Sequence, residues 1–202
     1  MRLLQMALDA IFPPRMRALR ARIVSYDALV PLSRAIRIAS VDPPAFSLLP
    51  YRHPLVQAAV TEAKFNDARH AQDALGRIFA DFLQALAPNE PYVLVPVPLS
   101  RQRKRQRGYN QAERICRAAR LPLETALLAR ARDTPPQTGL GGKARRENLK
   151  DAFAARKPPD PYTLYIVVDD VITTGTTLAA AAAALRAAGA QRILPVALAH
   201  SP

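Results

Sequence analysis

The segment 162–199 constrains the fold more than any other part of the chain. Residues Tyr162–Val168 form a continuous apolar and β-branched run, which is typical of a strand buried in a parallel sheet. Leu178–Ala188 has good helix sequence, Gly189 stands where a helix stop belongs, and Arg192–Ala199 reads as another strand. Strand, turn, helix and strand make a βαβ unit. The sequence therefore predicts an α/β protein with a parallel sheet flanked by helices.

The turn between this strand and helix carries the chemistry. Asp169 and Asp170 follow the strand at its carboxyl end, where open α/β sheets bind ligands. Backbone N–H groups and hydroxyls at the start of the helix suit a phosphate dianion. They belong to Thr173, Thr174, Gly175, Thr176 and Thr177. Two acids next to a phosphate-binding turn would repel a ligand that placed phosphate against both. A sugar 5-phosphate avoids this, because its hydroxyls can bind the acids while its phosphate binds the turn.

The rest of the chain shows weaker patterns. Apolar residues recur at helical spacing between residues 74 and 86, Tyr92–Val97 reads as a short strand, and Tyr109–Ala119 reads as a helix. Residues 131–150 are rich in Gly, Pro and Arg without periodicity, which favours a mobile loop. Residues 1–50 hold repeated prolines and predict a helix followed by an extended arm.

Composition sets the broad class. A chain of 202 residues that is 50% hydrophobic has the size and apolar content of one ordinary domain. One cysteine and three histidines argue against a disulfide or a structural zinc site. Residues 1–11 lack the apolar centre of a signal peptide, and no stretch reaches the roughly 18 apolar residues of a membrane span. We expect a cytoplasmic protein.

Positive charge is concentrated in one quarter of the chain. The net charge is +13, and residues 101–150 alone carry fourteen bases against four acids. Such a density attracts phosphates on nucleic acid, on an anionic membrane or on a small ligand. It is also compatible with a solvated face, because this chain prefers Arg to Lys. Charge alone does not choose among these partners.

The segment Val167–Thr177 resembles the diphosphoribosyl-binding signature of type I phosphoribosyltransferases. Further blocks between about residues 51 and 199 resemble the ComF family, whose members include accessories for DNA uptake in natural transformation and whose fold is similar to that of phosphoribosyltransferases. These blocks are Tyr51, Leu55, Lys64-Phe65, Val95–Leu99, Arg103, Arg105, Arg107–Gln111, Arg130, Arg132, Thr134, Gln137, Leu140, Arg145, Asn148 and Phe153.

The resemblance implies a role for each matching residue. Asp169 and Asp170 would bind the ribose hydroxyls, residues 173–177 the 5-phosphate, and Arg145 would belong to a flexible catalytic hood. The ligand implied is phosphoribosyl pyrophosphate with Mg²⁺, the metal being held mainly by ligand oxygens and water rather than by the protein. The residues implied for pyrophosphate are Val97, Pro98, Leu99, Arg103, Arg105, Arg107 and Lys64.

The chain departs from the family at its start. Typical ComF proteins begin with a four-cysteine zinc module, whereas residues 1–50 contain no cysteine. We therefore expect residues 1–50 to be a degenerate, zinc-free counterpart of that module and residues 51–202 to be the phosphoribosyltransferase-like domain.

Two functions stay open at this point. One is an enzyme that transfers ribose 5-phosphate to an acceptor and releases pyrophosphate. The other is a non-catalytic sensor of the same ligand, or an accessory that handles single-stranded DNA with competence proteins. Tyr109 is the only aromatic residue within 101–150, which argues against a dedicated single-strand reader.

Overall fold

The computed structural model describes residues 24–87, 89–131 and 152–201. Their centre is a five-stranded sheet in the order β1-β2-β7-β6-β3, in which β1 is antiparallel to β2 and the other neighbours are parallel. The strands are β1 (Ile36–Ile38), β2 (Ala45–Pro50), β3 (Tyr92–Pro96), β6 (Leu164–Ile172) and β7 (Arg192–His200). The predicted α/β class with a mostly parallel sheet is confirmed.

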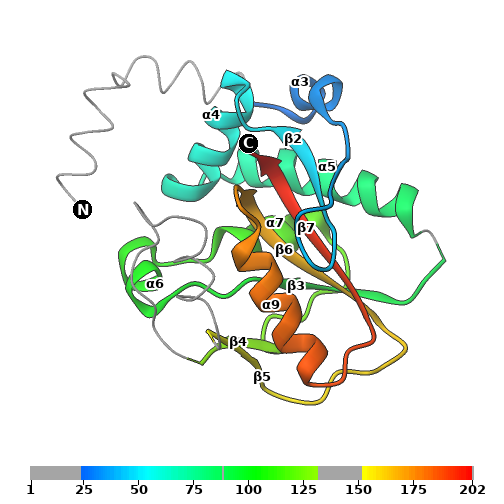
Figure 1. Ribbon diagram of the computed structural model, residues 1–202. Coiled ribbons are helices and arrows are strands. Elements are labelled where there is room, and N and C mark those ends of the chain that lie inside the picture. Colours follow the sequence, from blue (N-terminus) through cyan, green and yellow to red (C-terminus); the bar gives the residue numbers. More distant parts are fainter. Residues whose placement is uncertain (1–23, 88, 132–151, 202) are drawn as a thin grey trace.

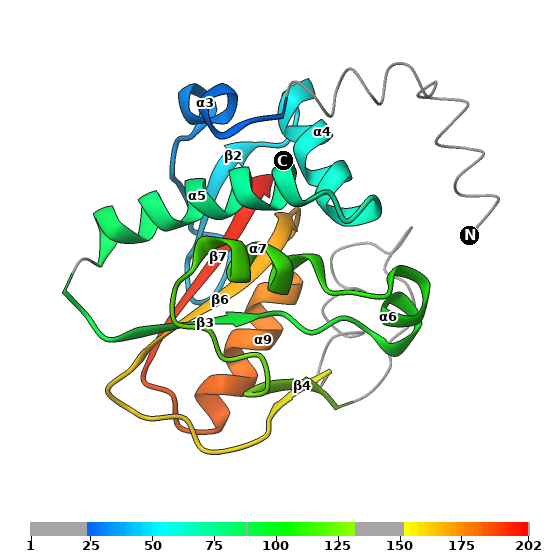
Figure 2. The same ribbon diagram turned by 180° about the vertical axis from the view of Figure 1, so that it is seen from behind.

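Helices cover both faces of the sheet (Figures 1 and 2). One face packs against α4 (Pro54–Phe65), α5 (Arg69–Leu86) and α7 (Gln111–Ala119). The other packs against α9 (Thr176–Ala187) and a small antiparallel pair, β4 (Leu128–Arg130) with β5 (Phe153–Ala155). The described chain is completed by α3 (Tyr26–Leu29), the 3₁₀ turn η1 (Val30–Leu32) and α6 (Arg101–Arg107).

The strand that delivers the acids is longer than the sequence indicates. We expected it to end at Val168, but β6 continues to Ile172, so Asp169 and Asp170 lie inside the strand and not after it. Pairing with β7 sustains this extension, whereas β3 stops at Pro96 opposite Val168. The two acids therefore extend beyond the end of β3, on a strand that has a backbone partner on one side only.

Most other predicted elements are found where the patterns placed them. The helix expected over 178–188 is α9, the strand expected over 192–199 is β7, and the helix expected over 109–119 is α7. The basic run Arg101–Arg107 forms α6. Its sequence has no apolar periodicity, and none of its residues is buried. The residues at its two ends stabilise this helix. The Ser100 hydroxyl accepts a bond from the Arg103 N–H at the start, and Gly108 ends the helix with φ +80°.

The predicted N-terminal arm contributes directly to the sheet. Its residues 45–50 form β2 and pair with β7 over Phe46–Pro50. The helix expected before this arm, and nearly all of the loop expected over 131–150, lie outside the described residues. The interpretation of residues 1–50 as a counterpart of a zinc module stays a prediction. None of the described helices has the length and apolar character needed to cross a membrane.

Candidate functional site

A cavity of about 620 Å³ opens where the parallel strands end. The residues immediately after β2, β3, β6 and β7 are Tyr51, Val97, Thr173 and Ser201, and all four line it. Open α/β sheets bind ligands at this edge because the loops that follow parallel strands converge there. We call it the ligand cavity.

A larger hollow of about 730 Å³ lies at the opposite end of the sheet, beside Tyr92 and Thr163. Of its acids, Glu90 is paired with Arg192 and Glu124 with Lys157. A third acid, Asp160, accepts bonds from the Tyr162 N–H and the Thr163 hydroxyl. The acids of this hollow are therefore already bonded, and none of its lining residues begins a helix, unlike the turn at the edge of the ligand cavity.

The ligand cavity gathers most of the site residues that the sequence predicts. Ten of them line it: Lys64, Val97, Pro98, Leu99, Arg103, Arg107, Asp169, Asp170, Thr173 and Thr177. Thr174, Gly175, Thr176 and Arg105 are not among the lining residues, although the first three belong to the turn at its edge. Arg145 lies outside the described residues. The structure also brings Gln111 and Tyr51 to the cavity, which the sequence offers only as part of the family blocks.

The two acids point to opposite faces of the sheet. Side chains alternate along a strand, and Val167 packs with the α9 cluster whereas Val168 packs with the cluster of α4, α5 and α7. Asp169 accordingly lies on the α9 side, partly exposed, and its Oδ1 accepts a bond from the Asp170 N–H at 2.9 Å. Asp170 turns toward α4 and α7 and is only 6% exposed. The pair is therefore adjacent in sequence but unequal in environment.

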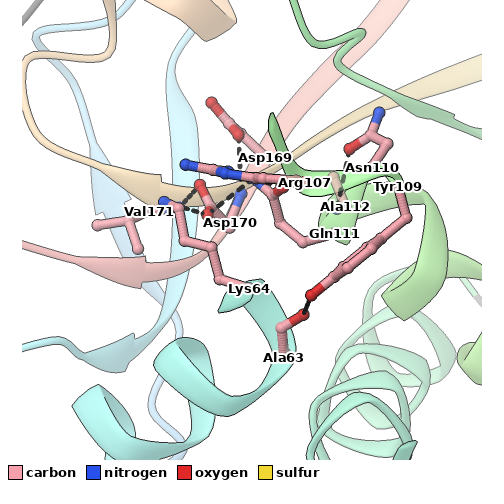
Figure 3. A network of polar contacts seen from close by, with 10 residues as sticks. All are labelled: Ala63, Lys64, Arg107, Tyr109, Asn110, Gln111, Ala112, Asp169, Asp170 and Val171. Carbon is pink, nitrogen blue, oxygen red and sulfur yellow. Dashed lines mark hydrogen bonds and ion pairs between the residues drawn. The ribbon is translucent and has the colours of Figure 1, made fainter. Parts of the chain in front are cut away.

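Asp170 is held by a set of donors from three elements (Figure 3). Its Oδ2 lies 2.6 Å from Lys64 Nζ at the end of α4 and accepts a bond from Gln111 Nε2 of α7 at 3.0 Å. Its Oδ1 accepts a bond from the Val171 N–H at 2.8 Å. A carboxylate has about four acceptor positions, so Asp170 has room for roughly one further donor.

These environments drive the two carboxyl pKa values apart. Burial, followed by the charge of Asp170, raises the pKa of Asp169 to about 7. Burial also opposes ionisation of Asp170, but the charge and hydrogen bond of Lys64 outweigh it and hold the pKa of Asp170 below its usual range. Near neutral pH the pair thus combines one fixed carboxylate with one group that can exchange its proton.

Gln111 connects this acid to the basic side of the cavity. Its side chain is buried, and its Oε1 accepts a bond from Arg107 Nη1 at 3.0 Å while its amide donates to Asp170. Burial lowers the pKa of Arg107, whose guanidinium also lies 5.2 Å from the centre of the Phe65 ring. No periodicity marks Gln111 as functional, because a buried residue in the first turn of a helix reads as packing.

Tyr109 fixes the position of Lys64. Its hydroxyl donates to the carbonyl of Ala63 at 3.1 Å and accepts from the Asp67 N–H at 2.9 Å. The last turn of α4 is thereby joined to the start of α7, as Figure 3 shows. These two bonds to the end of α4 set where the Lys64 side chain begins.

The threonine turn depends on Gly175. Its φ of +73° lies in the left-handed region that favours glycine, and a Cβ placed there would lie 2.2 Å from Val41 Cγ2. The residue caps α9 without a side-chain hydrogen bond, so backbone N–H groups of the first turn face outward. Thr174 and Thr176 hydroxyls lie 2.8 Å apart at this position. The turn can accept an anion at the positive end of a twelve-residue helix.

Three similar proteins bear on the origin of the chain. Competence protein F of Haemophilus influenzae is 40% identical over 117 residues, which are 55% of this chain and 51% of that protein. DNA utilization protein YhgH is 31% identical in Escherichia coli K12, over 151 residues, and 29% identical in Salmonella typhimurium, over 149 residues. Both YhgH matches cover 70% of this chain and 60% of the relative.

The chain thus spans about half to three fifths of the length of the curated relatives it matches. No family model matches it. The chain is homologous to Competence protein F and to DNA utilization protein YhgH, and its predicted kinship with the ComF family is confirmed.

Proposed function

We propose that the chain binds phosphoribosyl pyrophosphate with Mg²⁺ and transfers its ribose 5-phosphate to an acceptor. The observation that carries the proposal is the composition of the ligand cavity, which joins two acids, a threonine turn and four basic side chains at one sheet edge. A sugar that carries a phosphate and a pyrophosphate has a complementary group for each: hydroxyls for the acids, the phosphate for the turn and the pyrophosphate for the basic side chains. On this proposal the fold is of the type I phosphoribosyltransferase kind, with β6 as its ligand-bearing strand.

Each part of the ligand has a counterpart in the cavity. The 5-phosphate occupies the turn 173–177, where the N–H groups of α9 begin. The ribose hydroxyls donate to Asp169, and Asp170 accepts through the position that its three donors leave open. The pyrophosphate lies along residues 97–99, within reach of Lys64, Arg103 and Arg107, because Arg forks bind phosphate oxygens in pairs.

The residues present fit a metal ion that arrives with the ligand. Within residues 24–87, 89–131 and 152–201, no group of three or more His, Cys, Asp or Glu side chains is placed to hold an ion. Mg²⁺ bound through phosphates keeps several waters and needs only one or two carboxylates. Asp169 is suited to that task because it forms no ion pair with the described residues. When bound, the ion would offset the negative charge of the leaving pyrophosphate.

The transfer itself exchanges one bond for another. The bond from the anomeric carbon to the pyrophosphate oxygen breaks, pyrophosphate leaves with the electron pair, and an acceptor atom bonds to the carbon. Lys64 and Arg107, which their bonds to Asp170 and Gln111 hold in place before the reaction begins, stabilise the charge that grows on the leaving group. The exposed Arg103 at the cavity adds a further positive charge. Arg145, which lies outside the described residues, would cover this site.

We also propose a cellular role linked to DNA uptake and natural transformation. It rests on the homology to proteins named for competence and for DNA utilization. The alternative within this role is a sensor that binds phosphoribosyl pyrophosphate without turnover.

Calorimetric titration tests the binding step. Phosphoribosyl pyrophosphate with Mg²⁺ should bind the wild type and fail to bind the Asp169→Asn/Asp170→Asn variant. Arg37→Ala is the control, because Arg37 is exposed on β1 at the far edge of the sheet, and it should bind like the wild type. Equal affinity of the wild type and the double variant, or no binding by either, would refute the proposal.

Separate ligands resolve the two subsites. Arg103→Ala should weaken pyrophosphate binding by roughly tenfold to a hundredfold, the worth of a hydrogen bond to a charged group, and leave ribose 5-phosphate binding unchanged. Release of pyrophosphate in the presence of candidate acceptors then distinguishes a transferase from a sensor. Binding without release for any acceptor favours the sensor.

A further inference from the structure

Two opposite charges line the ligand cavity without forming an ion pair. They are Arg107, the last residue of α6, and Asp170 of β6. Burial lowers the pKa of Arg107, and the charge of Asp170 opposes that shift, so the two groups attract each other. Within the described parts of the chain, however, Asp170 pairs with Lys64, and Arg107 forms no ion pair. A third group must therefore keep the guanidinium from the carboxylate.

The side chain of Gln111 bridges the two charges. Its Nε2 donates to Asp170 Oδ2 and its Oε1 accepts from Arg107 Nη1, both at 3.0 Å (Figure 3). Gln111 is only 3% exposed, so water has little access to these bonds. A carboxylate can only accept and a guanidinium can only donate, which fits the amide in one orientation. A neutral amide thus satisfies both charged groups and separates them.

We infer that Gln111 is a positioning residue, which keeps Arg107 and Asp170 apart so that the guanidinium can bind pyrophosphate and the carboxylate can bind the ribose. The inference rests on the proposed function for the identity of the ligand. Arg107 uses one N–H on Gln111 and keeps other donors for phosphate oxygens. Asp170 keeps the acceptor position that its three donors leave open. A direct ion pair would occupy both.

The backbone of Gln111 is fixed by the residue before it. Gln111 is the first residue of α7, and Asn110 caps this helix by accepting a bond from the Ala112 N–H at 3.1 Å. The Asn110 amide also donates to the Val97 carbonyl at 2.9 Å, which joins the start of α7 to the loop after β3. Gln111 can therefore hold its two partners at set positions.

Replacing Gln111 by Met removes both bonds and keeps an unbranched side chain of similar length. Asp170 Oδ2 then lacks one donor, and Arg107 Nη1 lacks its acceptor. Because polar groups left unpaired in a buried site are costly, we expect the guanidinium to turn to the carboxylate, which Arg binds readily. Arg107 is then withdrawn from pyrophosphate, and Asp170 is withdrawn from the ribose.

Calorimetric titration with inorganic pyrophosphate and Mg²⁺ tests the inference through a double-mutant cycle. Gln111→Met should weaken pyrophosphate binding by roughly tenfold to a hundredfold. In a chain that already carries Asp170→Asn, the same replacement should change the affinity by less than about threefold, because the attracting charge is absent. Equal weakening in both backgrounds would show that Gln111 only supports the fold, and unchanged binding in Gln111→Met would refute the inference outright.

Gln72→Met is the matched control. Gln72 is also buried and donates to an acid, Asp67, at 2.7 Å, but it lies outside the ligand cavity. It should bind pyrophosphate like the wild type, and a loss as large as that of Gln111→Met would count against a specific role. Gln111→Asn is the second variant, in case Met disturbs folding. Its amide is polar but too short to reach both partners, so it should also weaken binding only where Asp170 is present.

A crystal structure of Gln111→Met without ligand gives a measurement that needs no binding. Arg107 should lie in direct contact with Asp170, and a guanidinium that stays apart would overturn the inference. Phosphoribosyl pyrophosphate binding by the wild type, together with an unmoved Arg107 in the variant, would refute the role of Gln111 and leave the proposed function standing. No binding of either ligand by the wild type would refute the proposed function, and the crystal structure would still decide whether Gln111 separates the two charges.

Discussion

Replacing Lys64 by Met should lower the free energy of unfolding, because the buried Asp170 carboxylate loses its only ion-pair partner among the described residues. In the wild type the Asp170 side chain is 8% exposed and accepts from Lys64, Gln111 and the Val171 N–H. Lys64→Met keeps the length of the side chain and leaves two of these donors. Removing one partner of a buried pair costs about 3–5 kcal/mol. Because the Lys64 side chain is itself 23% exposed, water can enter, and we expect about 2–3 kcal/mol.

Urea unfolding at pH 7 measures this cost. With a slope of about 2 kcal/mol per molar urea, the midpoint should fall by about 1–1.5 M. Lys157→Met is the matched control: its ion pair with Glu124 is exposed, so its midpoint should hardly move. The double variant Lys64→Met/Asp170→Asn should recover most of the loss, because no buried charge remains.

The stability loss caused by Lys64→Met should depend on pH in a defined direction. Lys64 holds the pKa of Asp170 below its usual range, so its stabilisation is complete above the unfolded pKa of about 3.9 and is lost as pH falls through the lower folded value. In Lys64→Met, only the two remaining donors oppose the effect of burial, so the pKa of Asp170 is higher than in the wild type and acid protonates the carboxyl more readily. The difference between the two proteins should therefore shrink toward pH 4. A loss under about 1 kcal/mol, or one that stays constant with pH, would refute the reasoning.

Three further predictions follow from the same region. The folded pKa of Asp169 is raised to about 7, so this group lowers the free energy of unfolding as pH rises from about 4 to 7. Asp169→Asn should therefore flatten that part of the plot of unfolding free energy against pH. An unchanged plot would contradict the assignment. Gly175→Ala should cost about 2 kcal/mol or more, from left-handed strain and the clash with Val41, and Val41→Ala in the same chain should restore only part of it by thermal unfolding. Tyr109→Phe should cost about 1–2 kcal/mol because two hydrogen bonds are lost, and loss of phosphoribosyl pyrophosphate affinity beyond that of a surface variant would show that Lys64 is displaced.

The parts of the fold that the sequence predicted well are those with local signals. The strand at 164–172, the helix at 176–187 and the strand at 192–200 combine β-branched runs, a glycine stop and helix propensity. Helix α6 lacks any such signal, because its seven residues are all Arg, Lys or Gln and none of them is buried. Its existence depends on Ser100 and Gly108 at its ends, which are common residues in loops as well.

The site could be predicted as a set of residues but not as a division of roles. Two adjacent acids in a loop after a strand could share one environment and act as equivalent carboxylates. Two adjacent acids within a strand point to opposite faces of the sheet. Since β6 continues to Ile172, alternation sends Asp169 and Asp170 to opposite faces, and each meets a different helix layer. Lys64 and Gln111, separated from Asp170 by 106 and 59 positions in the chain, then decide which acid is fixed and which can exchange a proton. Such a difference arises from tertiary contacts, so no spacing within the acidic segment itself contains it.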